Sequence, residues 1–263
     1  MKKKYLSYAQ ELEDLILYDA LNGVEKGFYI DVGANDPWIL SVTKSFYDLG
    51  YCGINIEPLD YEFKQLVEDR PRDINLCVGV GDKDGELLLC TMGTGSSVDK
   101  TIVDNAIKNG VNATTIPIFT LTGICDKYLL SNQNIDFCKI DVEGFEKEVL
   151  LGFDLTKYRP NIFVIESAEP GTTIPSHEKW EYILLDNDYE LAYSYGVNRY
   201  YTDKKISKTF VFIGVDKLLE KYEVYLPCQK ASLITSESNV IQIIYQAIYC
   251  LKQIFYKLTR VVK

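Results

Sequence analysis

Four acidic residues each stand at the end of an apolar run of the chain. Asp31 is in FYIDV, Glu57 closes CGINIE, Asp141 follows FCKI, and Glu166 closes NIFVIE. If these runs form parallel strands, their carboxyl ends meet at one edge of a sheet, where open α/β sheets bind their ligands. A single acid there could mark no more than a turn or the start of a helix. Four acids at equivalent places predict a site that uses carboxylates.

The loop after the first run, DVGAND, has one glycine where a dinucleotide site needs the pattern G-x-G-x-x-G. This argues against NAD or FAD and suits a nucleoside with an amino-acid tail, such as S-adenosylmethionine. The sulfonium of that ligand is cationic, which fits an acidic pocket. We therefore predict that it binds with Asp31, Gly33 and Asn35 around its methionine part, although Asn35 also suits a simple turn. Glu57 would bind the ribose hydroxyls, and Asp82, after the third run, the adenine.

Transfer of a methyl group from this ligand to an alcohol requires a group that accepts the alcohol's proton. Asp141 lies where the methyl group is expected, and His177, the single histidine of the chain, starts a predicted helix just past the fifth run. We predict that at least one of them is the proton acceptor. Two alternatives stay open. Asp141 could instead orient the amino group of the ligand or cap the next helix, and His177 could be structural.

Further polar residues near the same edge are candidates for contact with the substrate that accepts the methyl group. Glu143 follows Asp141 and could equally serve the first turn of a helix. Arg199, in GVNRYY, could pair with a substrate group, and Glu166 faces the same edge. Asp141 and Glu166 could also supply oxygen ligands to Mg²⁺, but no spacing requires a metal, and we predict none.

Apolar periodicity predicts the elements that position these residues. Strands are expected at residues 28–32, 52–57, 74–80, 135–144, 161–167, 189–195 and 208–215. Helices are expected at 8–21, from the Asp36–Pro37 pair to 49, and at 59–69, 122–130, 145–153 and 175–187. Between them, 82–120 should form a polar loop and strands at a sheet edge, because Pro117 favours an edge.

Strands that alternate with helices predict an α/β fold, in which helices cover both faces of a mostly parallel sheet. The last two strands are joined too briefly for a helical crossover, so one of them must run antiparallel. We expect an N-terminal helical segment over 1–26, a ligand-binding domain over 27–216 and a C-terminal extension over 217–263.

Three stretches closely resemble the FkbM family of S-adenosylmethionine-dependent methyltransferases: FYIDVGANDP…SVTKSFYDLGYCGINIEP, IDFCKIDVEGFEKEVLLGFD and NIFVIES. SYAQELEDLIL is similar to the opening helix of the family and HEKWE…YGVNRYY to its closing segment, so the resemblance covers residues 7–214. It implies the class I, Rossmann-like sheet of seven strands, the last inserted antiparallel between its neighbours. It implies methylation of a hydroxyl on a sugar, glycan or natural product. Ser96 and Ser97, in a loop that could be a plain linker, resemble a serine pair that faces the active site.

Composition limits the remaining function classes. The net charge of −10 argues against a nucleic-acid partner, which would need clustered Lys and Arg. The seven cysteines include no C-x-x-C pair, so neither a disulfide framework nor a zinc site is expected. The N-terminal residues do not resemble a secretory signal, and no apolar run is long enough to span a membrane. We expect a cytoplasmic protein.

Residues 238–263 form a predicted amphipathic helix. Its apolar face repeats at intervals of three and four residues, and it carries four basic residues and no acid: Lys252, Lys257, Arg260 and Lys263. The helix could dock on the body, pair with a second subunit, or lie on an anionic membrane surface, which attracts basic residues.

Two functions of different classes remain. The first is an active methyltransferase that modifies a hydroxyl group. The second is a non-catalytic cofactor-binding or scaffold domain, tethered to a membrane or partner by the C-terminal helix. The complete set of acids favours the first, and measurable methyl turnover would separate them.

Overall fold

The main sheet of the protein has seven strands. The computed structural model describes residues 2–22, 24–92, 95–97, 103, 105 and 107–226. Within them, the strand order of this sheet is β11-β12-β10-β9-β2-β3-β4. In that order the strands span Tyr189–Tyr195, Asn198–Asp203, Ile162–Glu166, Phe137–Ile140, Phe28–Val32, Cys52–Ile56 and Ile74–Leu76.

The strands β10, β9, β2, β3 and β4 run parallel to one another. Strand β12 is reversed: it pairs antiparallel with β10 on one side and with β11 on the other. The predicted mixed α/β architecture with a mostly parallel sheet is therefore confirmed. Because the parallel strands share one direction, their carboxyl ends lie along one edge, where the acids were expected.

The reversed strand lies earlier in the chain than predicted. We expected it at residues 208–215, but it is β12, and Ser207–Thr209 instead forms a short 3₁₀ helix, η2. Gly196, with φ +58°, lets the chain turn back directly after β11, so the antiparallel ladder forms at once. Three apolar residues of the misassigned segment pack against the core from outside the sheet: Phe210, Phe212 and Ile213.

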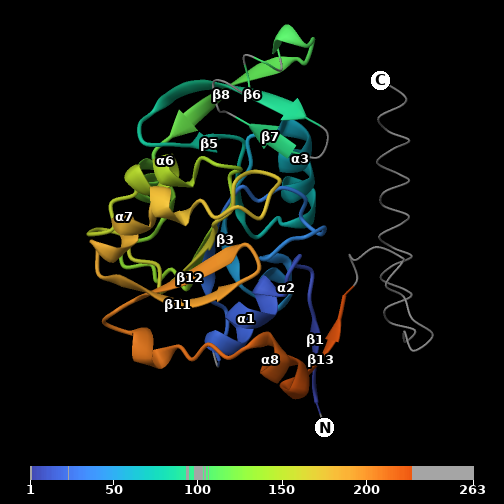
Figure 1. Ribbon diagram of the computed structural model, residues 1–263, viewed down its shortest axis with the longest axis vertical. Coiled ribbons are helices and arrows are strands. Elements are labelled where there is room, and N and C mark those ends of the chain that lie inside the picture. Colours follow the sequence, from blue (N-terminus) through green and yellow to red (C-terminus); the bar gives the residue numbers. More distant parts are fainter. Residues whose placement is uncertain are drawn as a thin grey trace, which may run out of the picture.

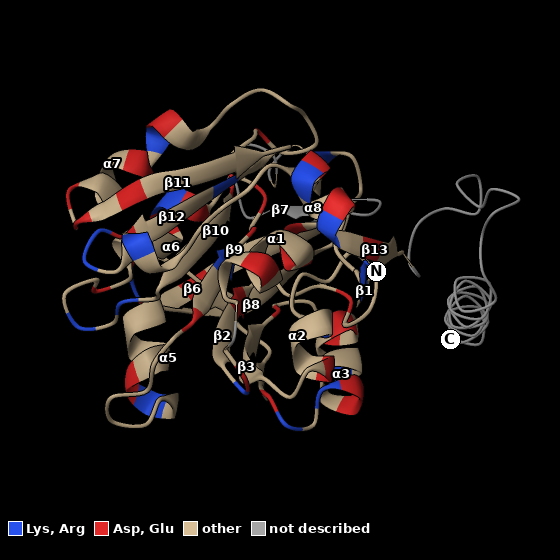
Figure 2. Cartoon of the chain, turned by 90° about the horizontal axis from the view of Figure 1, so that it is seen from below, with Lys and Arg blue, Asp and Glu red and all other residues tan. Residues whose placement is uncertain are grey.

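Helices cover both faces of the sheet, each over its own apolar core (Figure 2). One face carries α1 (Glu13–Ala20), α2 (Lys44–Asp48) and α8 (Val215–Lys221). The other carries α5 (Leu121–Tyr128), α6 (Glu146–Leu151) and α7 (Glu181–Leu185). Helix α3 (Asp60–Asp69) contacts β4. Successive side chains of β2 point to opposite faces of the sheet. Ile30 lies in the core beneath α5, α6 and α7, and Tyr29 lies in the core beneath α1, α2 and α8. Asp31 therefore points to the same face as Tyr29.

Two helices start later than predicted. The Asp36–Pro37 pair does not begin a helix; the Asp36 carboxylate accepts hydrogen bonds from the backbone N–H groups of Trp38 and Ile39, and α2 begins at Lys44. Leu40 has φ +58°, which an α-helix does not tolerate. The N-terminal helix likewise begins at Glu13, because Leu12 has φ +64°.

A second sheet of four strands lies near the top of Figure 1, with the order β5-β8-β6-β7. Its strands span Gly79–Val80, Ala113–Phe119, Gly85–Met92 and Gly95–Ser97. The predicted third strand, 74–80, is therefore split between two sheets: β4 ends at Leu76, and β5 belongs to the smaller sheet. Pro117 lies in β8, an inner strand of this sheet rather than an edge strand.

The two ends of the described chain meet in a separate parallel pair of strands, β1 (Lys3–Leu6) and β13 (Tyr222–Tyr225) (Figure 1). Tyr5 and Tyr222 are buried in the same core as α1 and α8. The predicted amphipathic helix over 238–263 lies outside the described residues. No helix among those described is long and apolar enough to cross a membrane.

Candidate active site

The four acids lie at or just after the carboxyl ends of neighbouring strands, at one edge of the main sheet. Strand β9, which precedes Asp141, lies between β2 and β10, and β3 lies on the other side of β2. The backbone N–H of Asp141 donates to the carbonyl of Val32 at 3.1 Å, which continues the ladder to the rim. The structure thus brings together Asp31, Glu57, Asp141 and Glu166, as the spacing predicted.

The loop after β2 is held tightly against the rim. Gly33 and Ala34 donate their backbone N–H groups to the carbonyl of Ile56 at 3.0 and 3.1 Å. Gly33 has φ +76°, and a Cβ at this position would lie 1.9 Å from the carbonyl oxygen of Asp141. Asn35 also has a positive φ, +51°. The loop therefore needs glycine at 33, both for its dihedral angles and for the close approach of two backbones.

Glu57 is buried at the end of β3, and backbone groups fix its carboxylate. Its two oxygens accept hydrogen bonds from the N–H groups of Asn35 and Leu59, each at 2.8 Å. Burial raises the pKa of Glu57 to about 7, against the lowering effect of these two hydrogen bonds. A carboxylate has about four acceptor positions, so two remain for the hydroxyl groups of a ligand.

Lys139, in β9, lies between Asp31 and Asp141 and pairs with both. The sequence analysis did not identify this residue. Its ammonium group donates to the carbonyl of Gly33 at 2.6 Å and lies 3.3 Å from an Asp31 oxygen and 3.4 Å from an Asp141 oxygen. In the β2–β9 ladder, Asp31 and Lys139 are direct partners. The available signal was a lysine inside the buried run FCKI, because a lysine there needs acidic partners.

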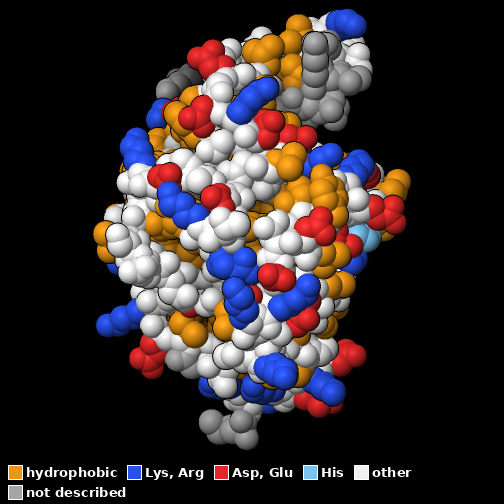
Figure 3. Space-filling model, turned by 90° about the vertical axis from the view of Figure 1, so that its left-hand side faces the viewer, with side chains coloured by type: hydrophobic (Ala, Val, Ile, Leu, Met, Phe, Trp, Pro, Cys, Tyr) orange, Lys and Arg blue, Asp and Glu red, His pale blue; other side chains and the backbone are white. Residues whose placement is uncertain are grey.

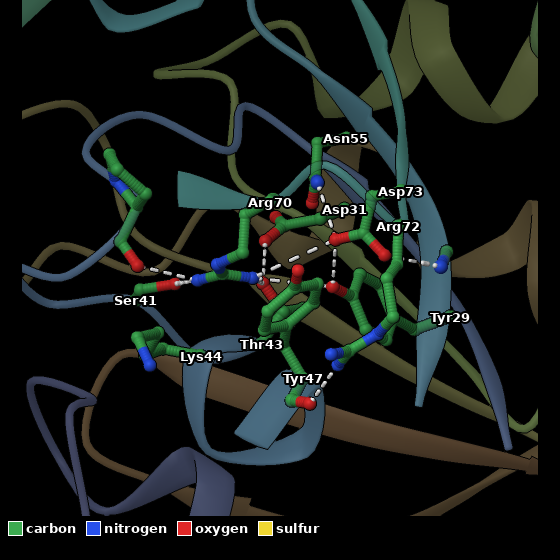
Figure 4. Close-up of polar contacts among 12 residues, drawn as sticks. Tyr29, Asp31, Ser41, Thr43, Lys44, Tyr47, Asn55, Arg70, Arg72 and Asp73 are labelled. Carbon is green, nitrogen blue, oxygen red and sulfur yellow. Dashed lines mark hydrogen bonds and ion pairs between the residues drawn. The ribbon is translucent and has the colours of Figure 1, made fainter. Parts of the chain in front are cut away.

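A second buried cation supports the loop that covers Asp31 (Figure 4). The other oxygen of Asp31 accepts a hydrogen bond from the Thr43 hydroxyl at 2.7 Å. Arg70, with no exposed surface, donates to the Pro37 carbonyl and to the Ser41 hydroxyl, and reaches the Thr43 hydroxyl at 3.4 Å. Arg70 therefore holds residues 37–43 next to β2, the strand that carries Asp31. The sequence pattern of α3, which Arg70 directly follows, does not indicate this role.

Three glutamates near the ends of β9 and β10, Glu143, Glu146 and Glu166, have raised pKa values. Burial, followed by repulsion from Asp141 and Glu143, raises the pKa of Glu166 to about 9. Burial and Asp141 also raise the pKa of Glu143. Glu146 holds the turn between them, because its carboxylate accepts hydrogen bonds from the N–H groups of Val142 and Gly144. Among the described residues, no group of three or more His, Cys, Asp or Glu could hold a metal ion.

These raised values make a prediction about stability. A carboxyl group whose pKa is higher in the folded protein binds more protons there than in the unfolded chain, so its contribution to stability is lost as the pH rises through the folded value. We therefore expect a larger free energy of unfolding at about pH 6 than at about pH 8 in urea titrations at constant ionic strength. Five buried carboxyl groups are responsible. Their pKa values are about 6 for Asp14, about 7 for Glu13, Glu57 and Glu146, and about 9 for Glu166.

Glu166→Gln provides the matched variant for this prediction. Glutamine keeps the shape of the protonated acid and cannot ionise, so this variant should lose less stability than the wild type between the same two pH values. Equal stability of the wild type at both pH values would contradict the prediction.

His177 lies in the 3₁₀ helix η1 (His177–Lys179) and is partly buried. The N–H of the preceding residue, Ser176, donates to the Ser167 carbonyl at 2.7 Å. That bond places His177 beside the segment that leaves β10 just after Glu166. The structure gives no direct contact between His177 and Asp141 within the described part of the chain.

Four other predicted residues remain: one is already paired, one is exposed beside the smaller sheet, and the side chains of two are not described. The Arg199 guanidinium donates to the Glu181 carboxylate and to the Tyr201 hydroxyl, both at 3.0 Å. Asp82 follows β5 of the smaller sheet and is exposed, because the third strand of the main sheet ends at Leu76. The strand assignment behind its predicted adenine contact was therefore wrong. The backbone of Ser96 and Ser97 forms part of β7, and their side chains lie outside the described part.

The donor set fits S-adenosylmethionine by its chemistry. The absence of a Cβ at Gly33 lets the loop after β2 pack directly against the Asp141 carbonyl at the rim. Glu57 retains acceptor capacity at the end of β3, and Asp31 is held next to the loop by Thr43 and Lys139. The carboxylates of Asp31 and Asp141 lie at this rim, and negative charge there favours a cationic sulfonium and ammonium group.

Comparison with known proteins agrees with this geometry. A family model, the methyltransferase FkbM domain, matches residues 31–191. The matched segment starts at Asp31 and includes Gly33, Glu57, Asp141 and His177. No curated protein matches the chain.

Proposed function

The chain belongs to the FkbM family of methyltransferases, and from this we propose that it transfers the methyl group of S-adenosylmethionine to a hydroxyl group of a sugar, glycan or related natural product. One observation carries the proposal: Asp31, Glu57 and Asp141 end adjacent parallel strands around the Gly33 loop. The reversed β12 between β10 and β11 further supports a class I, Rossmann-like methyltransferase sheet.

Each rim residue has a separate task in the proposed reaction. S-Adenosylmethionine, when bound, supplies an electrophilic methyl carbon and a thioether leaving group. Asp31 and the Gly33–Asn35 loop hold the amino-acid part, and Glu57 accepts hydrogen bonds from the ribose. These residues would fix the position of the cofactor relative to the acceptor site, and such positioning of two reactants can contribute on the order of 7–11 kcal/mol.

The acceptor's oxygen–hydrogen bond breaks as its oxygen bonds to the methyl carbon, and the proton must pass to the protein. Asp141 has a side chain that is 41% exposed at the rim, and His177 lies beside the end of β10. We assign the proton acceptor to this pair. Glu143 and Glu166 flank Asp141 and complete the acidic wall on the acceptor side.

The proposal extends to the acceptor side of the site and to other partners. We propose that Ser96, Ser97 and Arg199 contribute to the acceptor side, Arg199 by exchanging part of its contact with Glu181. A nucleic-acid partner is not part of the proposal, because the net charge is −10 and basic side chains are interspersed with acids on the face in Figure 3. Contact with a membrane or a second subunit through 238–263 stays a proposal that concerns residues outside those described.

Glu57→Gln tests the cofactor assignment. Glutamine replaces one acceptor oxygen by an NH₂ group, which cannot accept from a backbone N–H or from the ribose. We expect the affinity for S-adenosylhomocysteine, measured by calorimetry, to fall by about 10- to 100-fold, the worth of one hydrogen bond to a charged group. Because the pKa of Glu57 is about 7, wild-type affinity should also decrease as the pH falls below that value, and the variant should lose this part of the pH dependence.

Glu68→Gln, at an exposed position of α3, is the control and should bind like the wild type. An unchanged affinity in folded Glu57→Gln would refute the ribose assignment. Transfer of a labelled methyl group to any sugar in an acceptor panel would favour an enzyme over a scaffold domain that binds the cofactor without turnover.

A further inference from the structure

Lys139 occupies the point where three parts of the rim meet. Its ammonium group has three N–H donors and three partners: the Gly33 carbonyl at 2.6 Å, Asp31 at 3.3 Å and Asp141 at 3.4 Å. The first partner belongs to the loop after β2, the second to β2 itself, and the third to the segment after β9. No other described lysine joins these three segments.

The charge of Lys139 is stabilised by the two carboxylates beside it. Burial lowers the pKa of a lysine, but here attraction to Asp31 and then to Asp141 outweighs burial, and the pKa of Lys139 lies above its ordinary value. Lys139 is therefore a cation at every physiological pH. It compensates two carboxylates at once, and its donation to Gly33 orients a peptide group in the loop where the Cβ of any other residue would not fit.

We infer that Lys139 is a positioning residue of the methyl-transfer site. Its ammonium group acts through Gly33 and Asp141, and it fixes the loop Gly33–Asn35 and the candidate proton acceptor relative to each other. The inference rests on the proposed function for the identity of the ligand. The part of the inference that concerns the conformation of the loop Gly33–Asn35 does not depend on the identity of the ligand. Loss of a purely structural lysine would lower hydrogen-exchange protection throughout the sheet. Loss of a positioning lysine should lower it mainly in the loop at the rim.

Lys44 offers a matched comparison. It is also a buried lysine, on the same face of the sheet, but its ammonium group pairs with Asp48 and lies 4.3 Å from the centre of the Trp38 ring. It contacts none of the rim acids. Replacement of Lys44 by Met should therefore lower stability without a specific effect on the loop or on ligand binding.

The experiment compares Lys139→Met with Lys44→Met. Methionine keeps most of the apolar stem and removes the charge. In Lys139→Met we expect affinity for S-adenosylhomocysteine to fall by about tenfold or more. We also expect hydrogen exchange of the unliganded protein to show lost protection at Gly33–Asn35 with protection retained in β2 and β9. Lys44→Met should keep wild-type affinity within about threefold, and wild-type protection in the loop.

A charge-balanced pair of variants covers the case in which Lys139→Met does not fold. Lys139→Met/Asp31→Asn removes one cation and one anion, and it is compared with Asp31→Asn alone. Because Lys139 also acts through Gly33 and Asp141, the double variant should bind more weakly than Asp31→Asn and lose loop protection. Equal affinity and equal loop protection in either comparison would overturn the inference. Absence of ligand binding by the wild type would instead overturn the proposed function, and the exchange measurement would still decide the role of Lys139.

Discussion

Removal of the group that accepts the proton is expected to lower the turnover number by roughly 10²- to 10⁴-fold, the range typical of general-base catalysis. We expect this loss in Asp141→Asn, in His177→Ala, or in both, with labelled S-adenosylmethionine and a panel of sugar acceptors. Asparagine keeps the size of Asp141 but accepts no proton. Alanine removes the imidazole, which is not among the residues proposed to bind the cofactor, so the affinity of His177→Ala for S-adenosylhomocysteine should stay close to that of the wild type.

Two comparisons separate a chemical effect from a structural one. Glu178→Gln changes an exposed residue of the same 3₁₀ helix as His177 and should retain wild-type turnover. If His177→Ala turns over normally across neutral pH, histidine leaves the mechanism and Asp141 remains the candidate. Normal turnover in both variants would show that the proton passes to a different group.

Gly33→Ala is expected to abolish measurable cofactor binding, a loss of about 100-fold or more. The added Cβ would lie 1.9 Å from the carbonyl oxygen of Asp141, and the positive φ of +76° disfavours alanine in addition. Neither backbone can yield freely, because the Gly33 carbonyl is bonded to Lys139 and the Asp141 N–H to Val32. The loop must therefore leave its place at the rim. Calorimetry with S-adenosylhomocysteine measures the loss.

Gly110→Ala separates the collision from the dihedral strain. Gly110 has a similar φ of +82°, and a Cβ there would meet no atom within 4 Å. This variant should lose roughly 1 kcal/mol of stability through its backbone conformation and bind the cofactor normally. Wild-type affinity in a folded Gly33→Ala protein would contradict the close packing of the two loops.

The acids of the site could be predicted because they depend on local patterns. An apolar run that ends in an acid indicates a strand and its carboxyl end, and neighbouring strands of a parallel sheet then bring Asp31, Glu57 and Asp141 together. The match of the FkbM family model to residues 31–191 confirms the family that the same motifs resembled. Local patterns also predicted the core positions of β2, β3, β9 and β10.

The errors arose where tertiary contacts decide between local alternatives. The apolar segment that ends near Ile213 has the composition of a strand, yet the tight turn at Gly196 had already placed a strand at that position of the sheet. The Asp36–Pro37 pair resembles a helix start, but residues 37–43 are held in an irregular loop by Arg70. Arg70 and Lys139 could not be found from periodicity, because their roles depend on partners that are distant in the sequence.

The parallel pairing of β1 with β13 has a consequence for synthesis on the ribosome. Lys2 donates to the Leu219 carbonyl across 217 positions of the chain, so the first strand emerges long before its partner. At translation rates of about 5–20 residues per second, the wait is roughly 10 to 45 seconds. Throughout that interval the apolar surface of α1 lacks the cover that Val215, Leu218 and Tyr222 later provide. The speed of translation, rather than the intrinsic folding rate, therefore sets how long the nascent chain exposes this surface to chaperones.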